Sequence, residues 1–264
     1  ALLPGILAYV FLFGIGILLN LSIAIITALI AEYLILKIRN LPIKLFITDG
    51  SAIVAASLLA ISIPSIAPWW IIVIGTLFTI IVAKHLYGGL GSNLFNPAMV
   101  GYAVLLISFP AVMTKWSLPA SHLLDFNLTQ QIQIFMYGTK NIIDSVSSAT
   151  PLDYIKTQIF LNRPFELNFT NGMPINSYFN ASIIISLSFL IGGIFMWVKK
   201  IITWHLPVTF LISLTLISSI FWLIDSTRYL SPFIHLFSGG TLLCAFFIIT
   251  DPVSGPTTPK GKIF

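Results

Sequence analysis

Charged residues are scarce in this sequence. Asp, Glu, Lys and Arg together make up 8% of the 264 residues, whereas 57% are hydrophobic. Soluble domains carry about 25% charged residues. This chain has too few polar side chains to cover its surface in water, so we expect an integral membrane protein. Its long apolar runs favour helices over the alternating strands of an outer-membrane barrel.

Cysteine and histidine are rare as well. The single cysteine, Cys244, excludes an intrachain disulfide and any cysteine-ligated cluster held by this chain alone. The four histidines offer no pair at haem-ligand spacing, and we expect no metal site. The net charge of +5 arises from basic residues at helix ends, so no nucleic-acid partner is expected. No basic stretch precedes the first apolar run, so we expect no cleavable signal peptide.

The apolar runs predict about eight membrane helices, with Asn20 separating the first two. They cover residues 2–19, 20–38, 50–64, 68–86, 96–110, 181–198, 206–224 and 233–250. Residues 111–180 form the one long polar segment. Eight of the thirteen basic residues fall in short loops on one side, which should be cytoplasmic: Lys37, Arg39, Lys44, Lys84, Lys199, Lys200, Lys260 and Lys262. Residues 111–180 then lie on the periplasmic side of a bacterial inner membrane.

Three fifteen-residue segments share one pattern, a small or capping start and an Ile-Ser/Thr-x-Pro end. They are Gly50–Pro64, Asn96–Pro110 and Ser238–Pro252. A helix of this length spans about 22 Å, less than the roughly 30 Å of a bilayer core. In the predicted topology the third copy is inverted relative to the other two, which is typical of a repeat fold with a site at its interface. An alternative interpretation is that the pattern simply ends membrane helices.

The repeat predicts an all-α polytopic membrane protein of five plus five helices, of which about eight fall in this chain. Its parts would be a first repeat (residues 1–110), an extracytoplasmic loop (111–180) and an incomplete second repeat (181–264). We expect the natural protein to continue with one more span and one more short helix, and expect residues before Ala1.

Several polar residues stand at the ends of the short helices. Asp49 and Asn96 are placed as N-caps, Asp251 closes the third copy, and Asn93 lies in a glycine-rich approach to Asn96. One interpretation is that these residues only cap the helices. The alternative is that they form a ligand site, because helix termini at membrane depth present dipole ends and free backbone groups.

Few ionisable residues lie within the spans, and these are the default candidates for an ion path. Glu32 is one; the alternative is a helix-end residue near the membrane interface. Lys84 and His85 lie near a cytoplasmic helix end, where they can also serve as interfacial anchors.

The polar segment contains the run from Asp144 to Asp153, with Ser147 and Ser148 before Thr150 and Pro151. Thr150 as N-cap, Pro151 at the first helical position and Asp153 two residues later are typical of a helix start. The alternative is an enzyme-modified hydroxyl, because the helix N-terminus behind Thr150 favours a phosphate.

With these motifs the chain resembles the RnfD family, a membrane component of the Rnf electron-transport complex. More distantly, it is similar to the B subunit of the sodium-translocating NADH:quinone reductase. The resemblance extends over nearly the whole chain, in Thr48–Ala52, Ala67–Trp70, Ala83–Gly91, Asn93–Met99, Leu105–Pro110, Ser148–Asp153 and Phe246–Val253.

The resemblance implies that FMN is attached as a phosphoester to Thr150, within a motif that includes Asp144, Ser147 and Ser148. The family motif usually begins Asp-Gly and often has Gly two places before the Thr; this chain has Ser145 and Ser148 there. A second, non-covalent flavin, riboflavin, is also implied. We assign it, or an ion site, to the short-helix ends near Asp49, Asn93, Asn96 and Asp251.

The implied function is that of a membrane subunit of an ion-translocating ferredoxin:NAD oxidoreductase complex, not catalytic alone. Its FMN would relay electrons, coupled to ion transport. The implied partners are the other Rnf subunits, a flavin transferase, the lipid bilayer, and ferredoxin and NAD through sister subunits. The alternative is a channel or transporter for a small polar solute, an architecture that also uses broken helices.

Overall fold

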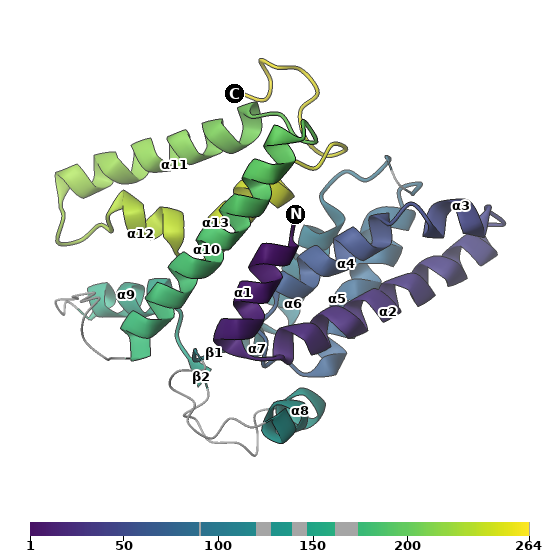
Figure 1. The fold of residues 1–264 in the computed structure, drawn as a ribbon, viewed down its shortest axis with the longest axis horizontal. Coiled ribbons are helices and arrows are strands. Elements are labelled where there is room, and N and C mark those ends of the chain that lie inside the picture. The colour runs from purple at the N-terminus through teal and green to yellow at the C-terminus, as the bar shows by residue number, and fades with distance from the viewer. Residues whose placement is uncertain (90, 120–127, 139–146, 162–173, 264) are drawn as a thin grey trace. The chain divides into compact units, whose positions relative to one another are not determined.

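The structure, a computed structural model, describes residues 1–89, 91–119, 128–138, 147–161 and 174–263. It divides into two compact units (Figure 1). The first, the Glu32 unit, contains Phe13–Ser117 and helix α8. The second, the Thr150 unit, contains Ala1–Leu12 and the described residues from Ser147 onward.

Helices make up nearly all the regular structure in the described residues. The Glu32 unit contains α2 (Gly16–Ile38), α3 (Ile43–Ile47), α4 (Ser51–Ser62), α5 (Trp69–Leu77), the π-helix η1 (Phe78–His85), α6 (Pro97–Ser108), α7 (Pro110–Met113), strand β1 (Trp116–Ser117) and α8 (Leu128–Tyr137). The Thr150 unit contains most of α1 (Leu3–Phe13), strand β2 (Ser147–Ser148), α9 (Pro151–Phe160), α10 (Pro174–Val198), α11 (His205–Ile224), α12 (Pro232–Phe237), α13 (Thr241–Leu243) and the π-helix η5 (Cys244–Ile248).

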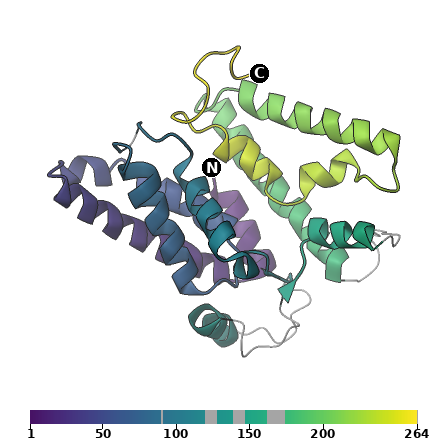
Figure 2. The same cartoon turned by 180° about the vertical axis from the view of Figure 1, so that it is seen from behind.

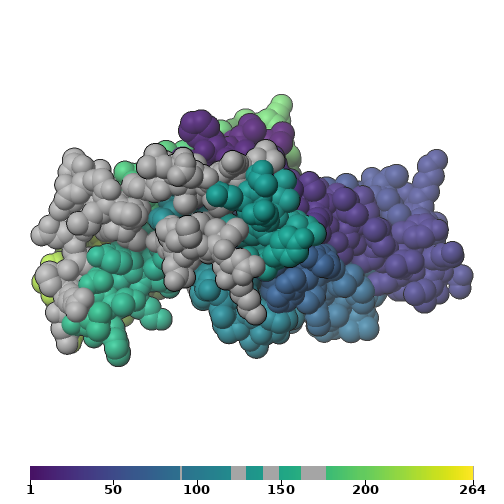
Figure 3. All heavy atoms as spheres, turned by 90° about the horizontal axis from the view of Figure 1, so that it is seen from below, coloured from purple at the N-terminus to yellow at the C-terminus, as the bar shows by residue number. Residues whose placement is uncertain are grey.

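Three described helices are long and apolar enough to cross a membrane. They are α2, the Ser177–Val198 part of α10, and α11. Four shorter apolar helices accompany them: Leu3–Phe13, Ser51–Ser62, Trp69–His85 and Pro97–Ser108. This composition confirms the prediction of a helical membrane protein. The α8 and α9 helices of the long polar segment lie at the surface in Figure 3, in teal and green.

The first two helices separate at Gly14, so the predicted break at Asn20 is wrong. Gly14 has a φ of 84°, a left-handed conformation that glycine adopts without steric strain. Asn20 lies inside α2, fully buried, and its Nδ2 donates to the carbonyl oxygen of Pro64 at 3.1 Å. A polar residue can continue a membrane helix when its amide finds such a partner.

The three repeated segments each contain a short helix. In the first two copies it is α4 and α6, twelve residues each. In the third it runs from α13 into η5, after a break where Gly239 has a φ of 65°. The predicted span 233–250 is therefore wrong as one helix: it is divided into α12 and the α13–η5 helix.

Small residues bring the helices of the Glu32 unit together. The α2 helix packs along α4 and α5, and α6 packs against α5 and η1 (Figure 2). At Gly101 in α6, an added Cβ would lie 2.1 Å from the Thr79 hydroxyl and 2.6 Å from the Gly75 carbonyl oxygen. Such close approach at small residues is a common basis of helix packing in membranes.

Candidate functional site: a capping threonine and a buried charge cluster

Thr150 lies at the N-cap of α9 with a half-exposed side chain, as the sequence predicts. Its Oγ1 accepts a hydrogen bond from the Asp153 backbone N–H at 3.2 Å and donates to the Asp153 carboxylate Oδ2 at 2.7 Å. Both contacts hold the hydroxyl at the positive end of the helix. The capping interpretation is confirmed, and the Thr150 side chain is partly exposed.

The rest of the attachment motif is described in part. Ser147 and Ser148 form the strand β2, immediately before Ala149 and Thr150. Asp144 lies outside the described residues. The backbone around Thr150 therefore passes from a short extended segment directly into a helix start.

Asn96 caps α6: its Oδ1 accepts from the backbone N–H groups of Ala98 at 3.0 Å and Met99 at 3.4 Å. Asn93, which is buried, donates from Nδ2 to the Phe95 carbonyl oxygen at 3.1 Å. These contacts are local and order the approach to the short helix, which confirms the capping interpretation for Asn96.

The two aspartates of the candidate set order turns. Asp49 is not the N-cap of α4; Gly50 is, with a φ of 73°, and Asp49 Oδ1 accepts from the N–H of Ser51 at 2.7 Å. Asp251 follows η5, and its Oδ2 accepts from the Ser254 hydroxyl at 2.6 Å. Asp49 belongs to the Glu32 unit and Asp251 to the Thr150 unit.

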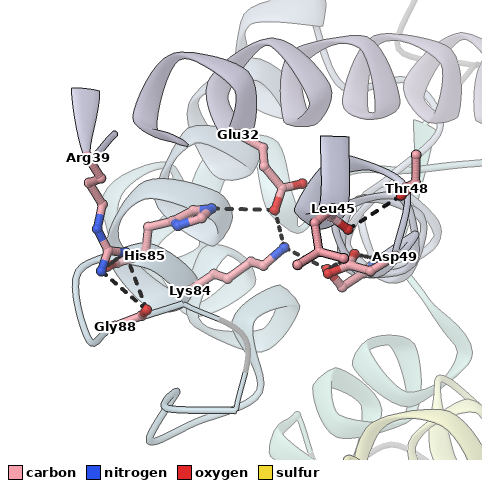
Figure 4. Close-up of polar contacts among 9 residues, drawn as sticks. Glu32, Arg39, Leu45, Thr48, Asp49, Lys84, His85 and Gly88 are labelled. Atoms are coloured by element: carbon pink, nitrogen blue, oxygen red, sulfur yellow. Dashed lines mark hydrogen bonds and ion pairs between the residues drawn. The ribbon is translucent and has the colours of Figure 1, made fainter. Parts of the chain in front are cut away.

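A cluster of charged residues lies buried in the Glu32 unit, where α2, α4 and η1 meet (Figure 4). Glu32 is fully buried, and Lys84 and His85 are 2% and 5% exposed. Lys84 Nζ donates to Glu32 Oε1, and His85 Nε2 lies 3.4 Å from the same oxygen. Lys84 and His85 are therefore not exposed anchors, and the Glu32 side chain faces the interior of the unit.

The cluster continues to the protein surface through Ser51. Lys84 Nζ also donates to Ser51 Oγ at 2.6 Å, and the Ser51 hydroxyl donates to Asp49 Oδ1 at 2.5 Å. Asp49 is exposed. A continuous hydrogen-bonded chain therefore joins the exposed carboxylate of Asp49 to the buried carboxylate of Glu32.

Some polar atoms of the cluster have no hydrogen-bond partner among the described residues. They are Glu32 Oε2 and both ring nitrogens of His85, the Nε2 contact lacking hydrogen-bond geometry. Burying a charge costs several kcal/mol unless it is paired, and the Lys84 ammonium supplies the pairing for Glu32. Glu32 Oε2 is therefore an unsatisfied hydrogen-bond acceptor in the described part of the chain.

Arg39, which directly follows α2, donates hydrogen bonds to carbonyl groups at the C-terminal end of η1 and just beyond it. Its Nη1 donates to the His85 carbonyl oxygen at 3.2 Å, and both terminal nitrogens donate to the Gly88 carbonyl oxygen at 3.3 Å. Arg39 and Ser51 were not predicted from the sequence as members of this site. The available signal was two opposite charges, Glu32 and Lys84, each inside an apolar run.

No group of three or more His, Cys, Asp and Glu side chains that could hold a metal ion occurs in the part of the chain that the structure describes. The cluster has one buried carboxylate, and its main partner is a lysine. Its chemistry is that of proton donors and acceptors held in series.

Comparison with known proteins places the chain in a family. Proteins of Shewanella denitrificans and Aliivibrio salmonicida, both named as the D subunit of an ion-translocating oxidoreductase complex, are similar to it. The first is 45% identical over 271 residues, which cover 99% of this chain and 77% of the relative; the second is 44% identical over 279 residues, covering 100% and 78%. The NQR2, RnfD, RnfE family model matches residues 1–264. The chain belongs to the NQR2, RnfD and RnfE family.

Proposed function

We propose that this chain is a membrane subunit of an ion-translocating oxidoreductase complex and carries FMN as a phosphoester on Thr150. The relatives named as the D subunit of such a complex support the first part. The single observation that supports the second is the accessible Thr150 hydroxyl at a helix N-terminus, in the sequence Ser-Ala-Thr-Pro that resembles the family's flavin-attachment motif.

The residues around Thr150 suit a phosphoester. Asp153 Oδ2 accepts a hydrogen bond from the Thr150 hydroxyl, so it is placed to take the proton that Thr150 Oγ1 loses when the ester forms. The first-turn N–H groups of α9 and its dipole favour a phosphate, and Pro151 at the first helical position sets the backbone direction there. Ser147, Ser148 and Asp144 would be read by the flavin transferase as part of its target segment.

When bound, the flavin supplies one-electron and two-electron transfer. Thr150 would hold it by the phosphate, so that the ring is left free to exchange electrons. The basic residues are grouped in short loops on one predicted side of the membrane. This distribution supports an inner-membrane location with Thr150 on the opposite, periplasmic side. The proposed partners are the sister subunits of the complex, a flavin transferase, and ferredoxin and NAD reached through those subunits.

The short helices support a repeat architecture for this function. The α4, α6 and α13–η5 helices occupy equivalent places in the three sequence copies. We propose that the third is inverted relative to the others and that two further elements complete five plus five. A second flavin, riboflavin, is proposed at the helix ends marked by Asp49, Asn93, Asn96 and Asp251.

The experiment is flavin fluorescence of the denatured chain on a gel, after co-expression with a flavin transferase. We expect a fluorescent band for the wild type and for Thr150→Ser, and none for Thr150→Ala. The matched control is Thr157→Ala, which removes an exposed hydroxyl from the same helix, bonded to the Asp153 carbonyl at 2.8 Å. Intact mass should rise by one FMN ester. Fluorescence that survives Thr150→Ala would contradict the attachment site.

A further inference from the structure

We propose that Asp49, Ser51, Lys84 and Glu32 form a proton-transfer relay between the surface of the Glu32 unit and its interior. The geometry carries the proposal: each neighbouring pair is joined by a hydrogen bond, from the exposed carboxylate to the fully buried one. The relay adds a proton-conducting function to the proposed subunit. It requires that the complex translocates ions, and it is independent of the flavin at Thr150.

The direction of the hydrogen bonds shows which transfer is ready to occur. The Lys84 ammonium donates to Ser51 Oγ, and the Ser51 hydroxyl donates to Asp49 Oδ1. When Lys84 passes a proton to Ser51 and Ser51 passes its own to Asp49, the products are a neutral amine and a carboxylic acid. The acid can then release its proton to water, because Asp49 is exposed.

Binding of a proton at the buried end of the relay, at Glu32, drives the transfer. Glu32 Oε2 has no partner in the described part of the chain, so a proton can bind there without breaking a bond. Protonated Glu32 no longer balances the charge of the Lys84 ammonium, and when Lys84 passes a proton to Ser51 the uncompensated charge leaves the interior. The amine that remains after release takes the proton from Glu32. One proton has then entered at Oε2 and one has left at Asp49, and both charges are restored.

Three further side chains lie beside the relay in the described residues: His85, Arg39 and Thr48. His85 Nε2 lies 3.4 Å from Glu32 Oε1 and so borders the buried end of the relay beside Lys84. Arg39 contacts backbone carbonyls at the end of η1, and so positions Lys84 and His85 without taking part in the transfer. Thr48, which precedes Asp49, bonds to the Lys44 carbonyl at 2.7 Å and stands outside the chain of donors.

The test uses the whole complex reconstituted in liposomes containing the pH-sensitive dye pyranine, with reduced ferredoxin as electron donor and NAD⁺ as acceptor. Ser51→Ala removes the central hydroxyl with little change in volume. We expect the initial rate of proton translocation, measured as the pyranine signal, to fall about tenfold or more. A positioned proton donor typically contributes at least this factor. Ser51→Thr retains a hydroxyl and should restore most of the rate.

Two further variants complete the test. Ser57→Ala is the matched control, because its hydroxyl lies in the same helix but donates to the Ile53 carbonyl oxygen, at 2.7 Å, instead of to a relay residue; it should translocate protons as the wild type does. If Ser51→Ala does not assemble, the exposed Asp49→Asn serves instead, with the same expected loss. Flavin fluorescence of each chain is recorded separately, so absence of the flavin and failure of the relay are distinguishable.

Two results would overturn the relay. One is proton translocation at the wild-type rate in assembled Ser51→Ala or Asp49→Asn. The other is a complex that accumulates ²²Na⁺ with a protonophore present and gives no pyranine signal in its absence, which would mean that the translocated ion is not a proton.

Discussion

Both terminal nitrogens of Arg39 donate to the carbonyl oxygen of Gly88, each at 3.3 Å. Carbonyl groups at a helix C-terminus lack intrahelical partners, and a cationic side chain there satisfies them and complements the helix dipole. Arg39 therefore ties the end of α2 to the end of η1. Lys84 and His85 lie on the last turn of η1, so this tie fixes the backbone from which both reach Glu32.

Arg39→Met should destabilise the Glu32 unit. It removes hydrogen bonds to two carbonyl oxygens, and we expect the free energy of unfolding to fall by about 1–2 kcal/mol because the groups are partly exposed. The measurement is equilibrium unfolding in detergent micelles. Arg228→Met, at an exposed arginine outside this unit, is the control and should lie within about 0.5 kcal/mol of wild type. Equal effects of the two variants would contradict a specific role for Arg39.

The Glu32–Lys84 pair should show strong coupling in a double-mutant cycle. Glu32→Leu or Lys84→Met alone leaves an uncompensated buried charge, and each should destabilise by about 3–5 kcal/mol. The double variant removes both charges and should be more stable than the sum of the single effects predicts. The same unfolding assay measures all four chains. Additive effects would show that the two groups do not interact.

Asn96→Ala tests the cap of the second short helix. Loss of the bonds to the Ala98 and Met99 N–H groups should lower the free energy of unfolding by about 1 kcal/mol. Asn180→Ala, at an exposed position inside α10, is the matched control and should have little effect. If Asn96→Ala leaves the free energy of unfolding unchanged, the cap does not stabilise this helix.

Gly101→Ala tests the close packing of α6 on α5 and η1. The new methyl group would lie 2.6 Å from the Gly75 carbonyl oxygen, a backbone atom that cannot rotate away. Overpacking of this kind should destabilise by about 1–3 kcal/mol. Gly240→Ala is the control, because no atom lies within 4 Å of its added Cβ and its φ of −96° suits alanine. Similar thermal stability of the two variants would refute the close contact.

Asp153→Ala should slow flavin attachment without abolishing it. The carboxylate that accepts the hydrogen bond from Thr150 is lost, while the hydroxyl itself remains. The measurement is the rate at which fluorescence appears in the purified chain mixed with transferase and its flavin donor. An unchanged rate would show that the transferase alone removes this proton.

Some local features were predictable from the sequence, although Asp49 is not the N-cap of α4, and the contacts between helices were not predictable. Asn96 and Thr150 were recognised as caps because a cap depends on residues within one turn. The break at Gly14 was missed because Asn20 has its partner at Pro64, forty-four positions away. Glu32 and Lys84 were seen separately, but their pairing depends on how α2 and η1 pack, which the hydrophobic pattern of an almost uniformly apolar chain does not specify.

Lys84 and His85 are consecutive residues, yet both approach one carboxylate. In an α-helix consecutive side chains diverge by about 100°; a π-helix places more residues in each turn, so its successive side chains point in more similar directions. The approach of both side chains to Glu32 therefore depends on the number of residues in Phe78–His85 as well as on their identity. A related chain with the same Glu, Lys and His but one residue fewer in this segment would keep the chemical groups and lose their convergence.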